Sequence, residues 1–143
     1  MDEADASGPA APPANPPAIP RRVHCGPAWM VTEGARIAVP VVPNFHFDDP
    51  DLGRVKARGL LLARRLGRLF VYANVCRHIP LTLDLGDGEV AGLESATFLC
   101  HHHGARFRIE DGRCISGPCE GESLVAIPHV VEDGELIVLL PSG

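Results

Sequence analysis

The chain has 143 residues, of which 22% are charged, and its formal net charge is -5. This length suits one domain with a core of its own, and the charge excludes the dense basic surface of a nucleic-acid binder. No apolar run reaches the roughly 18 residues of a membrane span, and the acidic start lacks the pattern of a signal peptide. We therefore expect a cytoplasmic protein that binds neither nucleic acid nor membrane.

The first segment is rich in proline and alanine, with six of each in residues 1–20. Such a segment has too little apolar surface to offset the entropy lost on ordering. We expect residues 1–22 to be a disordered tail and residues 23–143 to form one domain. Arg21 and Arg22 suggest a twin-arginine export signal, but no apolar signal core follows them.

From Val23 onward, short apolar runs alternate with Gly, Pro and Asp, and no segment has the period of an amphipathic helix. This punctuation predicts β-strands. Residues 35–42 are the first predicted strand, and the polar and aromatic residues 43–50 are predicted to be a loop. The aspartates in and beside that loop could bind a hard cation, although a solvated loop is the simpler interpretation.

Three turns divide the later segments. Leu66-Gly67 separates residues 59–64 from residues 69–75, and the second of these segments leads to Cys76. Two Asp-Gly dipeptides favour tight hairpin turns, because glycine readily adopts positive φ. Asp111-Gly112 joins 105–109 to the segment after Arg113, and Asp133-Gly134 joins 124–131 to 135–140. The predicted fold class is a small all-β protein with antiparallel sheets.

Two short motifs carry the chemistry: Cys76-Arg77-His78, and Cys100-His101-His102-His103-Gly104. Each offers one thiolate and one imidazole, so together they predict a metal site. A structural zinc site is one alternative, although zinc fingers usually pair two cysteines first and two histidines later. The other alternative is that the two motifs occur by coincidence and bind no metal. The three remaining cysteines, Cys25, Cys114 and Cys119, are predicted to be buried or idle thiols.

The motifs resemble the fingerprint of the Rieske [2Fe-2S] proteins. Phe107 and Gly117-Pro118 also fall at positions typical of that family, and the resemblance extends over about residues 59–140. Its last part is similar to the end of Rieske-type ferredoxins from bacterial ring-hydroxylating oxygenase systems. The resemblance implies the Rieske iron-sulfur fold, with a cluster-binding subdomain formed by two ligand loops.

The resemblance also implies the ligands and the function. Cys76 and Cys100 would bind one iron of a [2Fe-2S] cluster, while His78 and His103 would bind the iron that changes valence. The protein would be a ferredoxin-like one-electron carrier, and not itself an enzyme, between a flavin-dependent reductase and an acceptor such as an oxygenase. The alternative is an accessory or redox-sensing subunit of a larger oxidoreductase.

Four residues depart from the high-potential members of that family. Leu81 and His102 replace the cysteines of a disulfide between the ligand loops, and Ala105 and Phe107 replace a serine and a tyrosine that donate hydrogen bonds to cluster sulfurs. We therefore predict a potential in the lower half of the range of about -150 to +300 mV. His101 and His102 are expected to be exposed neighbours of His103, and residues 84–88 to be part of a surface excursion.

Overall fold

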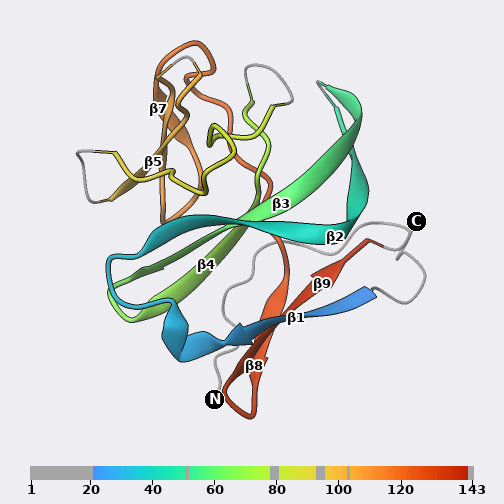
Figure 1. Cartoon of the computed structure of the whole chain (residues 1–143). Coiled ribbons are helices and arrows are strands. Elements are labelled where there is room, and N and C mark those ends of the chain that lie inside the picture. Colours follow the sequence, from blue (N-terminus) through green and yellow to red (C-terminus); the bar gives the residue numbers. More distant parts are fainter. Residues whose placement is uncertain (1–20, 51, 78–80, 93–95, 103, 142–143) are drawn as a thin grey trace.

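The structure is a computed structural model that describes residues 21–50, 52–77, 81–92, 96–102 and 104–141. The described residues form three antiparallel sheets, each of three strands (Figure 1). Their strand orders are β1-β9-β8, β2-β3-β4 and β5-β6-β7. The expected all-β fold with small antiparallel sheets is confirmed.

The nine strands of the described residues are β1 (Arg21–Pro27), β2 (Arg36–Asp49), β3 (Gly53–Arg65), β4 (Arg68–Ala73), β5 (Thr97–Leu99), β6 (Arg106–Arg108), β7 (Cys114–Ser116), β8 (His129–Glu132) and β9 (Glu135–Leu140). A 3-10 turn, Ala28–Met30, follows β1. Among these residues no helix is long and apolar enough to cross a membrane.

The central strand β3 is buried on both sides. Leu60 and Leu62 contribute to one core, together with residues of β1 and β9. Leu61 and Ala63 point to the opposite side, because successive residues of a strand face opposite ways. We call the second cluster the loop-side core; it contains Leu61, Ala63, Phe70, Tyr72, Cys76, Leu83, Val90, Phe98, Cys100, Ala105, Phe107, Ile109, Cys114, Cys119 and Leu124.

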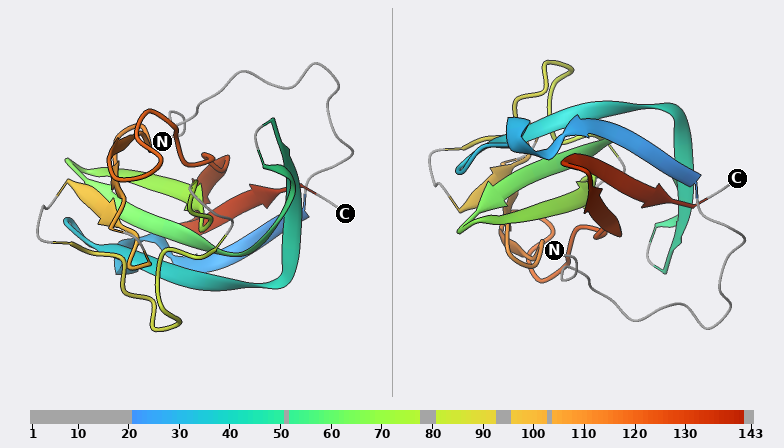
Figure 2. Two further views of the ribbon diagram at one scale, coloured as in Figure 1. Left: turned by 90° about the horizontal axis from the view of Figure 1, so that it is seen from above. Right: turned by 90° about the horizontal axis from the view of Figure 1, so that it is seen from below.

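The predicted loop at residues 43–50 is wrong, because β2 continues as far as Asp49. The register between β2 and β3 shifts between Pro40 and Phe45, and regular pairing then resumes to Asp49 opposite Gly53. Phe45 is only 2% exposed, so burial of this aromatic ring favours the strand. The bent end of β2 and the start of β3 rise beside the loop that follows β4 (Figures 1 and 2).

The strand β1 was not predicted. It begins at Arg21, two residues before the expected domain boundary, and pairs with β9. Residues 1–20, the predicted disordered tail, lie outside the described residues.

The predicted turns are confirmed. Leu66 and Gly67 both have positive φ, at 53° and 80°, between β3 and β4. Gly112 lies between β6 and β7, where the Cβ of any other residue would come 2.8 Å from Cε1 of Tyr72. The Tyr72 hydroxyl in β4 donates to the Ile109 carbonyl, just after β6, at 2.5 Å. This hydrogen bond connects the β5-β6-β7 sheet to the β2-β3-β4 sheet.

Candidate iron-sulfur site

The first motif follows strand β4, at the edge of the loop-side core. Cys76 stands three residues beyond the last residue of β4 and is 1% exposed. Its backbone amide donates to the Leu81 carbonyl at 2.7 Å, so the chain returns close to Cys76 after the motif. His78 lies outside the described residues.

The second motif follows strand β5. Cys100 is fully buried, its amide donates to the Ala105 carbonyl at 2.8 Å, and its carbonyl accepts from Gly104 at 2.9 Å. Gly104 has a φ of 76°, which explains why glycine ends this tight turn. His103 lies outside the described residues.

One segment joins the two motifs. The backbone of Leu83 accepts from the His101 amide at 2.9 Å, and its own amide donates to Oδ1 of Asn74 at 2.8 Å. Asn74 precedes the first motif by two residues, so these bonds connect the chain before Cys76 with the second motif. The structure therefore brings Cys76 and Cys100 into one core.

A buried ion pair supports the first motif. The Arg77 guanidinium lies against the Asp49 carboxylate at the end of β2, with Nη1 2.7 Å from Oδ1. Its Nε is 3.6 Å from Oε1 of Glu122, a residue of the loop after β7. The stretch around Asp49, which had no role in the sequence interpretation, thus contacts the residue between Cys76 and His78.

The surface excursion was only partly predicted. Leu83 and Val90 are fully buried, and Asp84 is 7% exposed, whereas Leu85 is 64% exposed. The Asp84 carboxylate accepts from the Asn74 side chain and from the amides of Gly86 and Gly88, each at 3.0 Å. Burial raises the pKa of Asp84, but these hydrogen bonds outweigh it and hold the pKa below its usual value.

The four departures from high-potential relatives occupy two environments. Ala105 and Phe107 are completely buried in the loop-side core, whereas Leu81 is 44% exposed. His102 is exposed as expected, but His101 is partly buried, so the prediction of an exposed side chain is wrong there. The hydrogen bond from the His101 backbone amide to the Leu83 carbonyl draws residue 101 inward. The Nε2 atom of His101 is buried without a hydrogen-bond partner among the described residues.

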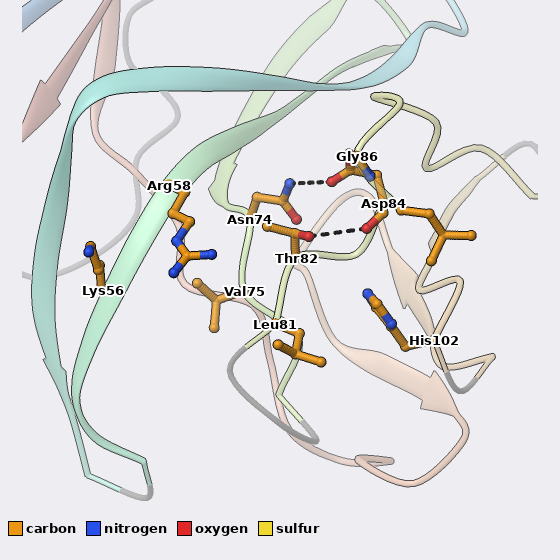
Figure 3. Close-up of a pocket in the computed structure, with 10 residues that line it drawn as sticks. Lys56, Arg58, Asn74, Val75, Leu81, Thr82, Asp84, Gly86 and His102 are labelled. Atoms are coloured by element: carbon orange, nitrogen blue, oxygen red, sulfur yellow. Dashed lines mark hydrogen bonds between the residues drawn. The ribbon is translucent and has the colours of Figure 1, made fainter.

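A cavity of about 400 Å³ opens beside the motifs (Figure 3). Lys56 and Arg58 of β3 line one side, and Leu81 and His102 lie across from them. Asp84 forms part of the wall, where its backbone carbonyl accepts from the Thr82 hydroxyl at 3.1 Å. The site thus combines an enclosed thiol side with an accessible face that is cationic and partly apolar.

The donor set fits an iron-sulfur cluster. Thiolates are the ligands of such clusters, and both Cys76 and Cys100 are in the thiol form, without a disulfide. Among the described residues no group of three His, Cys, Asp or Glu side chains could hold a metal ion. The two expected imidazole ligands, His78 and His103, lie outside the described residues.

An all-β domain with two buried thiols on adjacent loops has the form of an iron-sulfur domain. The sequence profile of the Rieske [2Fe-2S] domain matches residues 38–133, a range that includes both motifs. The chain belongs to the Rieske [2Fe-2S] domain family, and its cofactor is a [2Fe-2S] cluster.

Solved structures from carbazole 1,9a-dioxygenase systems share the fold. The ferredoxin of carbazole 1,9a-dioxygenase from Nocardioides aromaticivorans IC177 superimposes with a TM-score of 0.58 at 22% identity, over 85% of this chain and 98% of the ferredoxin. The terminal oxygenase of carbazole 1,9a-dioxygenase from Novosphingobium sp. KA1 gives a TM-score of 0.63 at 20% identity, over 87% of this chain. This chain spans only 31% of that oxygenase. No curated protein sequence matches the chain.

Proposed function

We propose that this chain is a one-electron carrier whose cluster is bound by Cys76, His78, Cys100 and His103. The observation that carries the proposal is the match to a ferredoxin over 98% of that ferredoxin's length. A terminal oxygenase is matched over less than a third of its length, so the likeness covers one part of such an enzyme. By its likeness to the ferredoxin, we propose that the chain acts as an electron-transfer component and not as an enzyme by itself.

The cluster, when bound, supplies a centre that accepts and releases one electron. The protein's own residues hold the centre and exclude water. Cys76 and Cys100 provide thiolates from within the loop-side core, where Phe98 and Phe107 are fully buried. Arg77, held by Asp49, fixes the backbone between the two ligands of the first motif.

The partners are redox proteins: a flavin-dependent reductase as donor, and an oxygenase or another acceptor. The ferredoxin fold occurs in carbazole 1,9a-dioxygenase, where a solved structure contains a complex between oxygenase and ferredoxin. The face formed by Lys56, Arg58, Leu81 and Leu85 suits a brief contact with an acidic partner surface, because it pairs positive charge with exposed apolar side chains. We place the carrier in the cytoplasm, since none of its five cysteines, all of them described, forms a disulfide.

The test is electron exchange by the purified holoprotein. A carrier is reduced by a flavin-dependent reductase at a rate that depends on the concentrations of both proteins, and an acceptor then reoxidises it. Stopped-flow absorbance follows both steps, and visible colour distinguishes the cluster from colourless zinc. Slow, non-saturating exchange with every reductase and acceptor tested would contradict the carrier function.

Two matched variants sharpen this test. Cys76→Ser should abolish the cluster's absorbance, whereas Cys25→Ser should retain it, because Cys25 packs against the other core. Reversing the charges of Lys56 and Arg58 to glutamate should slow exchange with an acidic partner and weaken its salt dependence. The control is Arg22→Glu, which disturbs only an exposed pair with Glu132 on the far sheet.

A further inference from the structure

Two cysteines outside the motifs lie against each other in the loop-side core. Cys114 begins β7 and Cys119 lies in the loop after it, and their sulfur atoms are 3.1 Å apart. They are 1% and 4% exposed. The sequence interpretation of buried thiols is confirmed for both, but their contact could not be predicted from it. A disulfide bond is about 2.05 Å long, so the two sulfurs need to approach by roughly one ångström.

The backbone holds this pair together. The Cys114 amide donates to the Glu122 carbonyl at 2.7 Å, and the Cys114 carbonyl accepts from the Gly121 amide at 3.0 Å. The Cys119 carbonyl accepts from the Glu122 amide at 2.9 Å. These hydrogen bonds already hold the two ends of the loop close together. A bond between the sulfurs would therefore need little rearrangement of the backbone.

The pair also lies in the same core as the two motif cysteines, Cys76 and Cys100. Gly117, in the same loop, comes so close to the second motif that a Cβ on it would be 2.7 Å from Cα of Ala105. A covalent bond in this loop would therefore stiffen a segment that packs beside both thiols of the candidate site.

We propose that Cys114 and Cys119 are a reversible dithiol that a peroxide oxidises to a disulfide, stapling the loop beside the iron-sulfur site. One sulfur attacks the peroxide: an S–O bond forms, the O–O bond breaks, and one water leaves once protonated. The other sulfur then attacks the sulfenic acid: the S–S bond forms, the S–O bond breaks, and a second water leaves. Two thiols lose two electrons and hydrogen peroxide gains them, so the cluster's electron does not enter the balance.

The burial of the pair explains the choice of oxidant. A protein or glutathione disulfide has to reach an attacking sulfur directly, whereas hydrogen peroxide is small. Both cysteines are free thiols in this structure, so the dithiol is the starting state. This couple stands apart from the proposed carrier function, because its formation needs neither a reductase nor an acceptor.

The sequence offers a direct assay. No Lys or Arg follows Arg113, so trypsin releases both cysteines in one peptide, residues 114–143. The holoprotein is treated with hydrogen peroxide, blocked with an alkylating reagent and digested without reduction. We expect this peptide to be two hydrogens lighter and to carry no alkyl group, while the cluster's visible absorbance persists. Dithiothreitol should restore double alkylation.

Variants supply the controls. Cys114→Ser and Cys119→Ser should each prevent the two-hydrogen loss, and Cys25→Ser should leave it unchanged, because Cys25 packs against the other core. The wild-type assay decides even if a serine variant does not fold. A peptide that stays doubly alkylated while the cluster survives, or a disulfide that forms only after the cluster is lost, would overturn the proposal.

Discussion

Arg77 and Asp49 form a two-point ion pair across 28 residues of sequence, with Nη1–Oδ1 at 2.7 Å and Nη2–Oδ2 at 3.1 Å. Both side chains are about nineteen-twentieths buried, at 6% and 5% exposure. The pair ties the first motif to the end of β2. Because both charged groups are buried away from water, each needs the opposite charge of the other to offset the cost of its desolvation.

Replacing Asp49 with asparagine should destabilise the fold by about 3 kcal/mol or more, since it leaves the Arg77 charge buried and undercompensated. Glu122, at 3.6 Å, offers only partial compensation. Urea unfolding followed by circular dichroism measures the change, and the rate of cluster loss should rise in parallel. The matched control is Asp48→Asn, whose exposed pair with Arg54 should contribute less than about 1 kcal/mol. Equal effects of the two variants would refute this role.

A second prediction concerns Asp84 and acid. Its folded pKa lies below the ordinary value of 3.8, so the carboxylate contributes stability that is complete above that value. This contribution is lost as pH falls from 3.8 through the folded pKa, where the folded state takes up the proton. Asp84→Asn should therefore destabilise the protein at neutral pH, and its difference from wild type should shrink in acid.

Urea unfolding of both proteins over a pH series measures this difference, and acid effects that they share cancel. Asp111, whose pKa is lowered mainly by its hydrogen bond from Arg108, is one such shared effect. A constant difference between wild type and Asp84→Asn across the acid range would show that the ionised carboxylate is not the stabilising form.

The hairpin turns were predictable because their cause is local. Asp133 and Gly134, for example, both have positive φ, at 51° and 79°, and that conformation is favoured by the dipeptide itself. The two motifs were recognisable for a similar reason, since ligand chemistry restricts residue types at short spacing. Neither inference needed knowledge of distant contacts.

The errors came from contacts that are distant in sequence. The polar and aromatic composition of residues 43–50 suggested a loop, yet burial of the Phe45 ring and pairing with β3 made this stretch a strand. Strand β1 pairs with β9 at the other end of the domain, as the contact between His24 and Glu135 across 111 residues illustrates. The pairing of Asp49 with Arg77 leaves no local pattern either, which is why the role of that stretch was missed.

The third prediction is the reduction potential. Phe107 and Ala105 are fully buried near both motif cysteines and have no side-chain donor. A hydrogen bond to a charged acceptor is worth about 1.5 to 3 kcal/mol, and roughly 59 mV corresponds to a tenfold change for one electron. Protein-film voltammetry should therefore give a value in the lower half of the range of about -150 to +300 mV.

Adding a donor should reverse this effect. Phe107→Tyr and Ala105→Ser should each raise the potential on the order of 50 mV, provided that the hydroxyl meets the cluster sulfurs. Phe98→Tyr is the matched control, because Phe98 is equally buried in the same core but belongs to β5. A wild-type potential near the upper end of the Rieske range, or an equal rise in the control, would contradict the argument.

The last prediction separates the three consecutive histidines of the second motif. His103 is the proposed ligand because of its spacing from Cys100, whereas His102 is exposed and His101 is partly buried, with its backbone amide donating to the Leu83 carbonyl. Single alanine variants should show that only His103→Ala abolishes the rhombic electron paramagnetic resonance signal of the reduced protein. His102→Ala should keep both signal and stability, because its side chain projects toward solvent. His101→Ala should keep the signal and lose some stability, since it removes a partly buried ring; loss of the signal in this variant would move the ligand assignment to His101.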